Sequence, residues 1–404
     1  MSLLVTDGDQ RSTLAVVRAL GRSGIPVTVG ADCYPSLAGS SRYCSASVRY
    51  PSPQSDPDGF KSFLAAEVLS KPYKVLLPMT DITVRLIAEM REASVTSVNV
   101  PIPAAEKIRL SQDKCAMAAK AQEAGIACPQ TWIVNDLPQT RALAERLSYP
   151  VVIKPRYSRF YKDRRWWKGG VEFATGPGEL ISKCEKIHGR IPNPLIQERI
   201  EGEGRGVFLL IWDGELKAAF SHRRLREKPP WGGVSVYSES VPLDGELVQK
   251  SLRLLQSLDW QGVAMVEYKF DRRDGRPKFM EVNGRFWGSL QLAIDAGMNF
   301  PLLLYRLAAG ESLPPTFDFK VGVRNRWLLG DLDHLLICLT HSRGPGGLPM
   351  SHGSRLGTLW HFLEFYKRDL HYEVMRLGDA GPGWYELRRY LREALRGAMS
   401  RTEE

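Results

Sequence analysis

The chain has 404 residues, 43% hydrophobic and 25% charged, a composition that excludes a disordered chain and predicts two or three globular domains. The formal net charge of +10 suits phosphorylated small molecules, nucleic acids or anionic membranes, without choosing between them. The sequence shows no export leader and no apolar run of membrane-spanning length, so we expect a cytoplasmic protein without a transmembrane segment. The six cysteines lack CxxC spacing, which argues against a zinc site and favours a reducing cytosol.

The first hundred residues alternate between apolar runs and amphipathic segments. The runs "SLLVTD", "IPVTVGAD" and "YKVLLPMTD" are typical of strands, and "RSTLAVVRALGRSG", "FKSFLAAEVLS" and "ITVRLIAEMRE" are typical of helices. This alternation predicts a parallel α/β domain over residues 1–105. Gly8 lies at the first strand-to-helix turn without a GxGxxG pattern, so it indicates a structural turn more than a dinucleotide site.

Two lysines mark the next part of the chain. Lys114 lies near the start of a helical stretch, "SQDKCAMAAKAQEAG", and Lys154 closes the apolar strand "YPVVIKP". Lysine binds phosphate as a point charge, and a lysine at the end of a buried strand reaches the edge of a cleft. Both are candidate phosphate ligands, and ordinary surface lysines are the alternative.

A predicted hairpin carries two carboxylates and an amide. The runs "GVAMVEYKF" and "KFMEVNGRFWGS" flank Asp274-Gly275, a pair typical of tight turns. If the chain folds back there, Glu267 lies opposite Glu281, and Asn283 shares the face of Glu281. Opposed carboxylates repel unless a cation lies between them, and oxygen ligands suit Mg²⁺ or Mn²⁺, which also takes phosphate oxygens. The hairpin therefore suggests a metal–nucleotide site, with a solvated sheet face as the alternative.

The ordered set "SQDK", "VVIKP", "IQERIEGEG", "VAMVEYKF" and "FMEVNGRFWGS" resembles ATP-grasp ligases, especially carbamoyl-phosphate synthase subdomains and carboxylate-amine ligases. The resemblance runs from the N-terminus to about Gly310. It implies an α/β fold, α+β in the ATP-binding part. Residues 1–105 would form a Rossmann-like pre-ATP-grasp domain, 106–195 a central subdomain and 196–312 the C-terminal ATP-grasp subdomain. Residues 313–404 would form a helical extension of unassigned role.

The resemblance also implies roles for individual residues. The implied ATP ligands are the phosphate lysines, the adenine hinge and a ribose acid: Lys114, Lys154, Gln197, Glu198, Arg199, Ile200 and Glu203. Glu201 is close enough to Glu203 that the ribose role stays open between them. The implied Mg²⁺ or Mn²⁺ ligands are Glu267, Glu281 and Asn283. Arg285 and Lys154 are the implied catalytic residues, with Arg285 facing the transferring phosphoryl group.

Two stretches are candidate substrate contacts. The loop 156–170, "RYSRFYKDRRWWKGG", is basic and aromatic where the family often has a Gly-rich loop, and it either clamps an anion or packs down through its aromatic side chains. In "SHRRLREKPPWGGVS" we expect Arg224 to bind a substrate carboxylate, with Arg226, Gly232 and Gly233 beside it. Solvation of a strand edge is the alternative for this stretch.

The implied function is an ATP- and Mg²⁺-dependent ligase that activates a carboxylate as an acyl phosphate and couples it to an amine. Amino acids or peptides are candidate substrates, and a homodimer stays open. A carbamoyl-phosphate synthase-like enzyme or another carboligase with a different acceptor is the alternative within the fold. A non-enzymatic protein that binds nucleic acid or anionic membranes is the other alternative, but the basic residues are scattered, and no nucleic-acid partner is expected.

Overall fold

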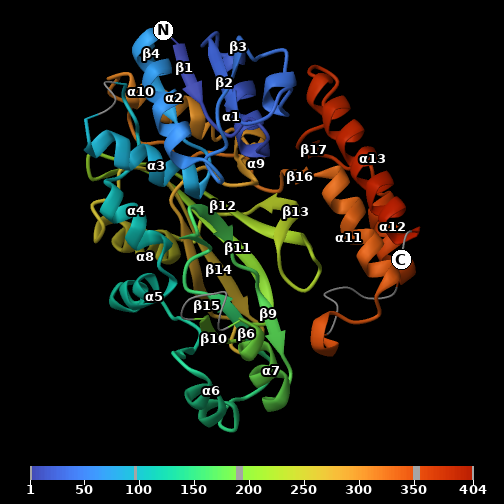
Figure 1. Cartoon of the computed structure of the whole chain (residues 1–404). Coiled ribbons are helices and arrows are strands. Elements are labelled where there is room, and N and C mark those ends of the chain that lie inside the picture. The colour runs from blue at the N-terminus through green and yellow to red at the C-terminus, as the bar shows by residue number, and fades with distance from the viewer. Residues whose placement is uncertain (1, 95–97, 188–193, 349–354, 403–404) are drawn as a thin grey trace.

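The computed structural model describes residues 2–94, 98–187, 194–348 and 355–402. Its N-terminal domain is the predicted parallel α/β unit, a four-stranded sheet in the order β3-β2-β1-β4 (Figure 1). The strands are β1 (Ser2–Val5), β2 (Val27–Ala31), β3 (Ala46–Arg49) and β4 (Tyr73–Leu77). The helices are α1 (Arg11–Arg22), η1 (Ala38–Ser40), α2 (Pro57–Ser70) and α3 (Asp81–Glu92). Because β1 and β2 are almost fully buried, they read as continuous apolar runs.

Two short helices, α4 (Ala105–Gln112) and α5 (Lys114–Glu123), follow this domain where the sequence predicted one helical stretch. The chain breaks at Asp113, which leaves the helical conformation and caps α5 by accepting hydrogen bonds from the backbone N–H groups of Cys115 and Ala116. The break makes Lys114 the first residue of α5, as predicted.

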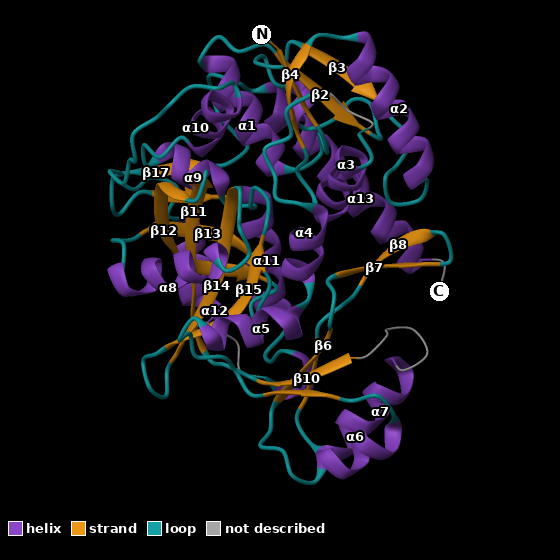
Figure 2. Cartoon of the chain, turned by 90° about the vertical axis from the view of Figure 1, so that its left-hand side faces the viewer, coloured by secondary structure: helices purple, strands orange, loops and turns teal. Residues whose placement is uncertain are grey.

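A small antiparallel sheet in the order β5-β10-β6-β9 forms the lower lobe in Figure 1. Its elements and those beside it are β5 (Thr131–Ile133), α6 (Leu137–Ala144), β6 (Val151–Pro155), β9 (Glu172–Ala174), α7 (Pro177–Ile187) and β10 (Pro194–Glu198). Between β6 and β9, the chain forms a separate two-stranded ribbon, β7 (Arg159–Lys162) and β8 (Arg165–Lys168). The predicted basic, aromatic loop is therefore mostly a hairpin, which Figure 2 shows standing between the lower lobe and the N-terminal domain.

The central sheet has seven strands in the order β15-β14-β11-β12-β13-β16-β17. Its first part contains β11 (Gly202–Trp212), β12 (Glu215–Lys228), β13 (Val234–Ser240), α8 (Gly245–Gln256), β14 (Gly262–Asp271), β15 (Pro277–Asn283), α9 (Leu290–Asp295) and α10 (Phe300–Ala308). The predicted tight turn Asp274-Gly275 lies between β14 and β15, and a second Asp-Gly turn, Asp213-Gly214, joins β11 to β12. Gly214 and Gly275 have φ values of 77° and 68°, which glycine adopts without strain.

The C-terminal extension is helical, as predicted, and also adds two edge strands to the central sheet. It consists of β16 (Arg324–Arg326), α11 (Leu328–Thr340), η2 (Pro345–Gly347), α12 (Arg355–Leu363), β17 (Leu370–Tyr372) and α13 (Gly381–Thr402). The helices α11, α12 and α13 lie along one side of the molecule, with α13 reaching the N-terminal domain (Figure 1). No helix among the described residues is long and apolar enough to cross a membrane.

One apolar core joins the N-terminal domain to the central sheet. Leu14 of α1 and Val29 of β2 share it with Trp287 and Phe300, which flank α9. Trp287 lies against the rings of Phe208 and Phe300, with centroids 4.2 and 5.2 Å away. Burial of a side chain such as Phe300 contributes about 1.5–3 kcal/mol. The shared core fixes the loop before α9, which carries Arg285, against the N-terminal domain.

Candidate functional site

The two predicted phosphate lysines lie close together. Lys154 ends β6 with 7% of its surface exposed, and burial, followed by the nearby charge of Lys114, lowers its pKa to about 8. Lys114 donates a hydrogen bond to Oγ of Ser158 at 2.6 Å. Burial beside another cation disfavours the charged form of Lys154, and a bound anion would offset this effect, so the pair is suited to an anionic ligand.

The carboxylate hairpin forms in the predicted register. Glu267 of β14 lies directly opposite Glu281 of β15, and Asn283 donates to Glu281 across 3.3 Å. Lys114 Nζ lies 3.8 Å from Glu281 Oε2. The negative charges of both glutamates also favour the charged form of Lys154, opposing the effect of burial on its pKa. The structure therefore brings these five residues, from four different elements, to one place.

The hairpin residues offer oxygen donors for a divalent cation. Burial raises the pKa of Glu267, and the charge of Glu281 adds to this effect, while Arg224 opposes it at 2.6 Å. No group of three or more His, Cys, Asp or Glu side chains among the described residues is arranged as a metal cage. Mg²⁺ or Mn²⁺ would thus be held by two carboxylates and the Asn283 amide, and phosphate oxygens and water would complete its shell. This donor set fits a nucleotide-bound metal.

Arg285 lies next to an acid from the N-terminal domain that the sequence analysis missed. Its Nε and Nη2 atoms donate to the two oxygens of Asp81 at 2.8 and 3.2 Å. Burial would raise the pKa of Asp81, but Arg285 outweighs it and lowers the pKa. Asp81 begins α3 directly after β4, and the carboxyl ends of parallel strands are where such sheets place their ligands. That position in "LLPMTD" is the signal that could have identified it.

A small cavity joins the two halves of this cluster. It is lined by Asp81 of the N-terminal domain, Lys114 and Ser158 of the central part, and Glu281 and Asn283 of the hairpin. Asp81, Lys114 and the hairpin residues Glu281 and Asn283 therefore face a common space. A phosphate group in this space would meet cationic groups on one side and the metal donors on another.

Asp113, a second acid that the sequence analysis missed, links the start of α5 to the residues just before β7. Asp113 accepts from Arg156 at 2.8 Å and from the Tyr157 hydroxyl at 2.9 Å. Burial would raise the pKa of Asp113, but these hydrogen bonds dominate and lower it. The "SQDK" motif contains this residue, and the sequence alone could have predicted that it caps a helix. The sequence could not have predicted the hydrogen bond to Arg156, because that bond depends on how β6 docks.

The predicted adenine hinge leaves the small sheet at its central strand. Gln197 pairs with β5 on one side and β6 on the other, and its side chain donates to Thr131 at 2.8 Å. The Glu198 carboxylate accepts from Arg273 at 2.5 Å. Among the described residues, no backbone carbonyl accepts from the Ile200 N–H. The place of Ile200 in the adenine hinge stays a prediction. Arg199 is ion-paired to Glu201.

The two candidate ribose acids are both ion-paired to arginines. Glu203 contacts Arg205 at 2.5 Å and Arg223 at 3.4 Å. Glu201 is engaged with Arg199. The ribose role stays a prediction, still open between the two acids.

The structure separates the two predicted substrate arginines. Arg224 points to the carboxylate hairpin, where it pairs with Glu267, and it also contacts Glu227 at 3.0 Å and the Gly233 carbonyl at 3.4 Å. The acids outweigh burial and raise the pKa of Arg224. Arg224 and Gly233 therefore lie beside the site.

Arg226 lies on the other side of a register irregularity in β12. It binds both oxygens of Asp331 at 2.6 Å and stacks on Tyr237, so it faces the C-terminal extension. Gly232 adopts φ 134° in the loop between β12 and β13. The structure does not bring Arg226 to the cluster around Glu267.

The basic hairpin β7–β8 is docked through one of its two tryptophans. Trp166 is 4% exposed within the apolar core of the N-terminal domain, with the Arg85 guanidinium over its ring, and its backbone N–H donates to the Gln54 carbonyl at 2.9 Å. Trp167 is partly exposed and stacks on Arg165 at 3.8 Å. Of the two readings left open for the aromatic pair, packing applies to Trp166, while Trp167 is accessible to a ligand.

Comparisons with known proteins show which family and which folds the chain resembles. Residues 190–329 match the model of a family described as ATP-grasp in the biosynthetic pathway with Ter operon. Over 278 residues the chain is 24% identical to the carbamoyl phosphate synthase large chain of Methanosphaerula palustris, which covers 66% of this chain. The chain spans about a quarter, 26%, of the length of that relative.

Solved structures of low sequence identity share the fold. An L-amino acid ligase from Bacillus licheniformis aligns with a TM-score of 0.60 at 19% identity, over 78% of this chain and 75% of its own. N5-carboxyaminoimidazole synthetase from Staphylococcus aureus aligns with a TM-score of 0.64 at 14% identity, over 84% of this chain and 86% of its own. A biotin carboxylase from Campylobacter jejuni, solved as a β-γ-ATP complex, aligns with a TM-score of 0.61 at 15% identity, over 80% of this chain and 74% of its own. Together with the family match over residues 190–329, these similarities confirm the resemblance that the motifs predicted and show that the chain has the ATP-grasp fold.

Proposed function

We propose that the protein is an ATP- and Mg²⁺-dependent ligase that activates a substrate carboxylate as an acyl phosphate and joins it to an amine. The observation that carries the proposal is the 3.8 Å approach of Lys114 Nζ to Glu281 Oε2, with Lys154 and Glu267 close by. Phosphate-binding cations and metal-binding carboxylates meet there around one cavity, as binding of a nucleoside triphosphate requires. The ATP-grasp fold of the chain supports the same reading.

Each residue would contribute to a two-step reaction. Lys114 and Lys154 hold the phosphates, and the Ile200 N–H and the Glu198 carbonyl pair with the adenine edge. The bound metal neutralises charge on the phosphates. The substrate carboxylate attacks the γ-phosphorus in line, the bond to the β-phosphate oxygen breaks, and ADP leaves; Arg285 faces the phosphoryl group as it transfers. The amine then attacks the acyl carbon, gives up a proton, and inorganic phosphate departs.

A coupled assay tests this proposal. The full-length protein is incubated with ATP, Mg²⁺ and pools of amino acids and short carboxylic acids, and ADP release and hydroxylamine-trapped acyl phosphate are measured. We expect an acid-dependent signal that Lys154→Met reduces at least about a hundredfold, because an electrostatic clamp on transferring phosphate has that magnitude. A variant at the exposed Lys61, Lys61→Met, is the matched control. If no acid in the pools stimulates ADP release, the ligase proposal fails.

A second candidate is a carbamoyl-phosphate synthase-like enzyme or another carboligase. The sequence match to a carbamoyl phosphate synthase large chain favours it. In such an enzyme, bicarbonate would take the place of the organic acid. ADP release that depends on bicarbonate, without any added organic acid, would select this candidate over the first.

The remaining expectations belong to the same proposal. The division into residues 1–105, 106–195, 196–312 and 313–404, a cytoplasmic location and a homodimer stay predictions. The described cysteines are all free thiols, which supports a reducing compartment. The nucleic-acid alternative loses support from the hairpin, because the Trp166 ring is buried in the N-terminal domain and cannot stack on a base.

A further inference from the structure

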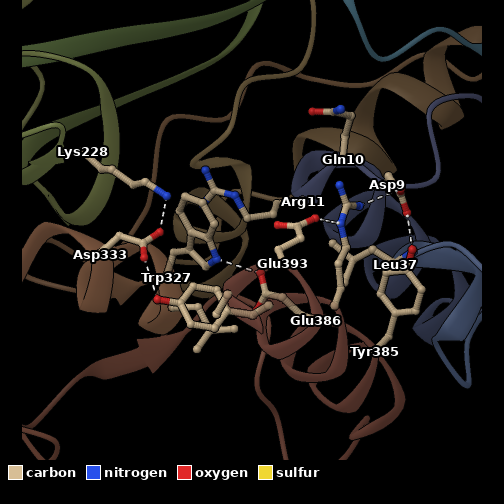
Figure 3. Close-up of a pocket in the computed structure, with 14 residues that line it drawn as sticks. Asp9, Gln10, Arg11, Leu37, Lys228, Trp327, Asp333, Tyr385, Glu386 and Glu393 are labelled. Atoms are coloured by element: carbon tan, nitrogen blue, oxygen red, sulfur yellow. Dashed lines mark hydrogen bonds and ion pairs between the residues drawn. The ribbon is translucent and has the colours of Figure 1, made fainter. Parts of the chain in front are cut away.

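A cavity of about 500 Å³ lies outside the predicted ATP site, and none of the predicted site residues lines it. It is enclosed by the start of α1, the end of β12 and the extension helices α11 and α13 (Figure 3). Its volume falls in the range of small-molecule sites. Three segments far apart in the sequence build it, and one of them is the C-terminal extension, to which the sequence assigned no role.

The cavity is lined by four acidic and three basic side chains, a slight acidic excess in a protein whose net charge is +10. The lining acids are Asp9, Asp333, Glu386 and Glu393, and the lining bases are Arg11, Lys228 and Arg389. Asp333 pairs with Lys228 and accepts from the Tyr390 hydroxyl at 2.6 Å. Asp9 accepts from Arg389 at 2.9 Å.

The basic side chain nearest to Glu386 is already shared with another acid. Arg11 is ion-paired to Glu373, whose pKa burial raises to about 7, with the charge of Glu386 adding to the shift. The Glu373 Oε1 atom is buried and lacks a hydrogen-bond partner among the described residues. Burial also raises the pKa of Glu386, although the Trp327 indole N–H donates to it at 2.7 Å. The charge of Arg11 thus stabilises both the buried Glu373 and the half-buried Glu386, with contributions from Arg376 and Arg389. One more positive charge in the cavity would stabilise both carboxylates further.

The Trp327 ring gives the cavity a surface that attracts cations. Arg11 lies over it, 3.8 Å from the ring centroid, and Lys228 lies 5.4 Å from the same centroid. Figure 3 shows the indole between these basic groups, with its N–H directed at Glu386. An aromatic face bordered by carboxylates is the usual arrangement for binding an ammonium or guanidinium group.

Two segments connect the cavity to the predicted ATP site along the chain. A Cβ atom on Gly288 would lie 3.5 Å from Arg11 Nη2, and Gly288 belongs to the loop after β15 that also carries Arg285. Lys228 ends β12, the strand that presents Arg224 to the carboxylate hairpin.

We propose that this cavity recognises an organic cation, a primary ammonium or guanidinium group, at the non-reacting end of a substrate, held by Glu386 beside the Trp327 ring. That the bound cation belongs to a substrate rests on the proposed ligase function, but binding of the cation itself does not require ATP. Binding there gives the C-terminal extension a role as the wall of a specificity pocket.

Isothermal titration calorimetry on the full-length protein tests the proposal with pairs of probes that match in shape and differ in charge. The pairs are L-lysine and L-norleucine, L-arginine and L-citrulline, and 1,4-diaminobutane and 1,4-butanediol. We expect at least one cationic probe to bind at least about tenfold more tightly than its neutral partner. Glu386→Gln keeps the shape of the side chain and removes its charge, so it should weaken that probe at least about tenfold. The control Glu246→Gln changes an exposed acid on α8 and should leave the affinity unchanged.

The outcomes separate this proposal from the ligase proposal. If no cationic probe binds better than its neutral partner, or if Glu386→Gln binds it as well as the unaltered protein, the cation pocket is wrong. Should Glu386→Gln unfold, Asp333→Asn at the other end of the cavity makes the same comparison. The affinity for ATP·Mg²⁺ is measured in each variant and should not change. If the unaltered protein releases no ADP from ATP with any acid tested, only the ligase proposal is overturned, because cation binding is measured without nucleotide.

Discussion

Arg285 and Asp81, 204 residues apart in the chain, form a two-pronged ion pair in which both oxygens of the carboxylate accept from the guanidinium. The pair joins the loop after the carboxylate hairpin to the first residue of α3 in the N-terminal domain. It fixes the plane of the guanidinium, because an arginine fork bound at two points cannot rotate freely. The orientation of the predicted catalytic arginine therefore depends on a domain that contributes none of the predicted ATP ligands.

We predict that Asp81→Asn lowers the turnover number about 10- to 100-fold, with little change in ATP affinity. The amide keeps the shape of the side chain but loses the charge, so Arg285 is held less firmly, and small misplacements of catalytic groups have effects of this size. Steady-state kinetics and a separate nucleotide titration measure the two quantities. The matched control is Asp58→Asn at an exposed position of the same domain. A variant that loses ATP affinity and turnover equally would contradict this positioning role.

Glu281→Gln should raise the Mg²⁺ concentration needed for half-maximal ADP release at least about tenfold. The substitution removes one of the two carboxylate donors and leaves Glu267 and Asn283 in place, so metal affinity falls while the sheet keeps its register. A Mg²⁺ titration at saturating ATP measures the change. Glu215→Gln, on the exposed start of β12, should behave as the unaltered protein. An unchanged Mg²⁺ requirement in Glu281→Gln would remove this residue from the metal site.

ATP affinity should fall as the pH rises through about 8. Burial and the neighbouring Lys114 lower the pKa of Lys154 to about 8, so its ammonium is charged below that pH and neutral above it. Only the charged form attracts phosphate, and bound phosphate in turn raises the pKa. Nucleotide titrations between pH 7 and 9.5 measure the effect. Lys154→Arg stays charged throughout and should give a flatter profile. An equally steep profile in that variant would assign the pH dependence to another group.

The hairpin itself was predictable because the Asp274-Gly275 turn specifies locally where the chain reverses. The exact pairing of Glu267 with Glu281 also depends on a register shift between Glu267 and Tyr268, which the turn does not specify. The phosphate lysines were predictable for a related reason, since each lies at the end of a recognisable element. Local rules therefore located the chemical groups of the candidate site.

The partners of those groups were less predictable. The bond between Arg285 and Asp81 depends on how the N-terminal domain docks through the shared core around Trp287. The sequence analysis treated Arg224 and Arg226 alike, but the strand is irregular between them, and they face different neighbours. Such an irregularity arises from the pairing of strands and leaves no clear sequence pattern.

The C-terminal extension is attached to the N-terminal domain by a buried ion pair, and this attachment gives a prediction for stability. Arg18 of α1 is 2% exposed, binds Asp379 at 2.8 Å, and donates to the carbonyls of Glu373 and Val374 at 2.8 Å. Arg18→Met would leave the Asp379 carboxylate buried without its cation, which costs about 3–5 kcal/mol. We expect a lower melting temperature and faster proteolysis of the extension.

The matched control for this change is Arg22→Met, one turn further along α1 at an exposed position, which should alter the melting temperature little. Because Glu373 lies behind Arg11 at the proposed cation pocket, Arg18→Met should also weaken the cationic probes while sparing ATP·Mg²⁺. Differential scanning calorimetry, limited proteolysis and the probe titration measure the three effects. Unchanged stability and unchanged probe affinity in Arg18→Met would show that the extension holds its place, and shapes the pocket, without this ion pair.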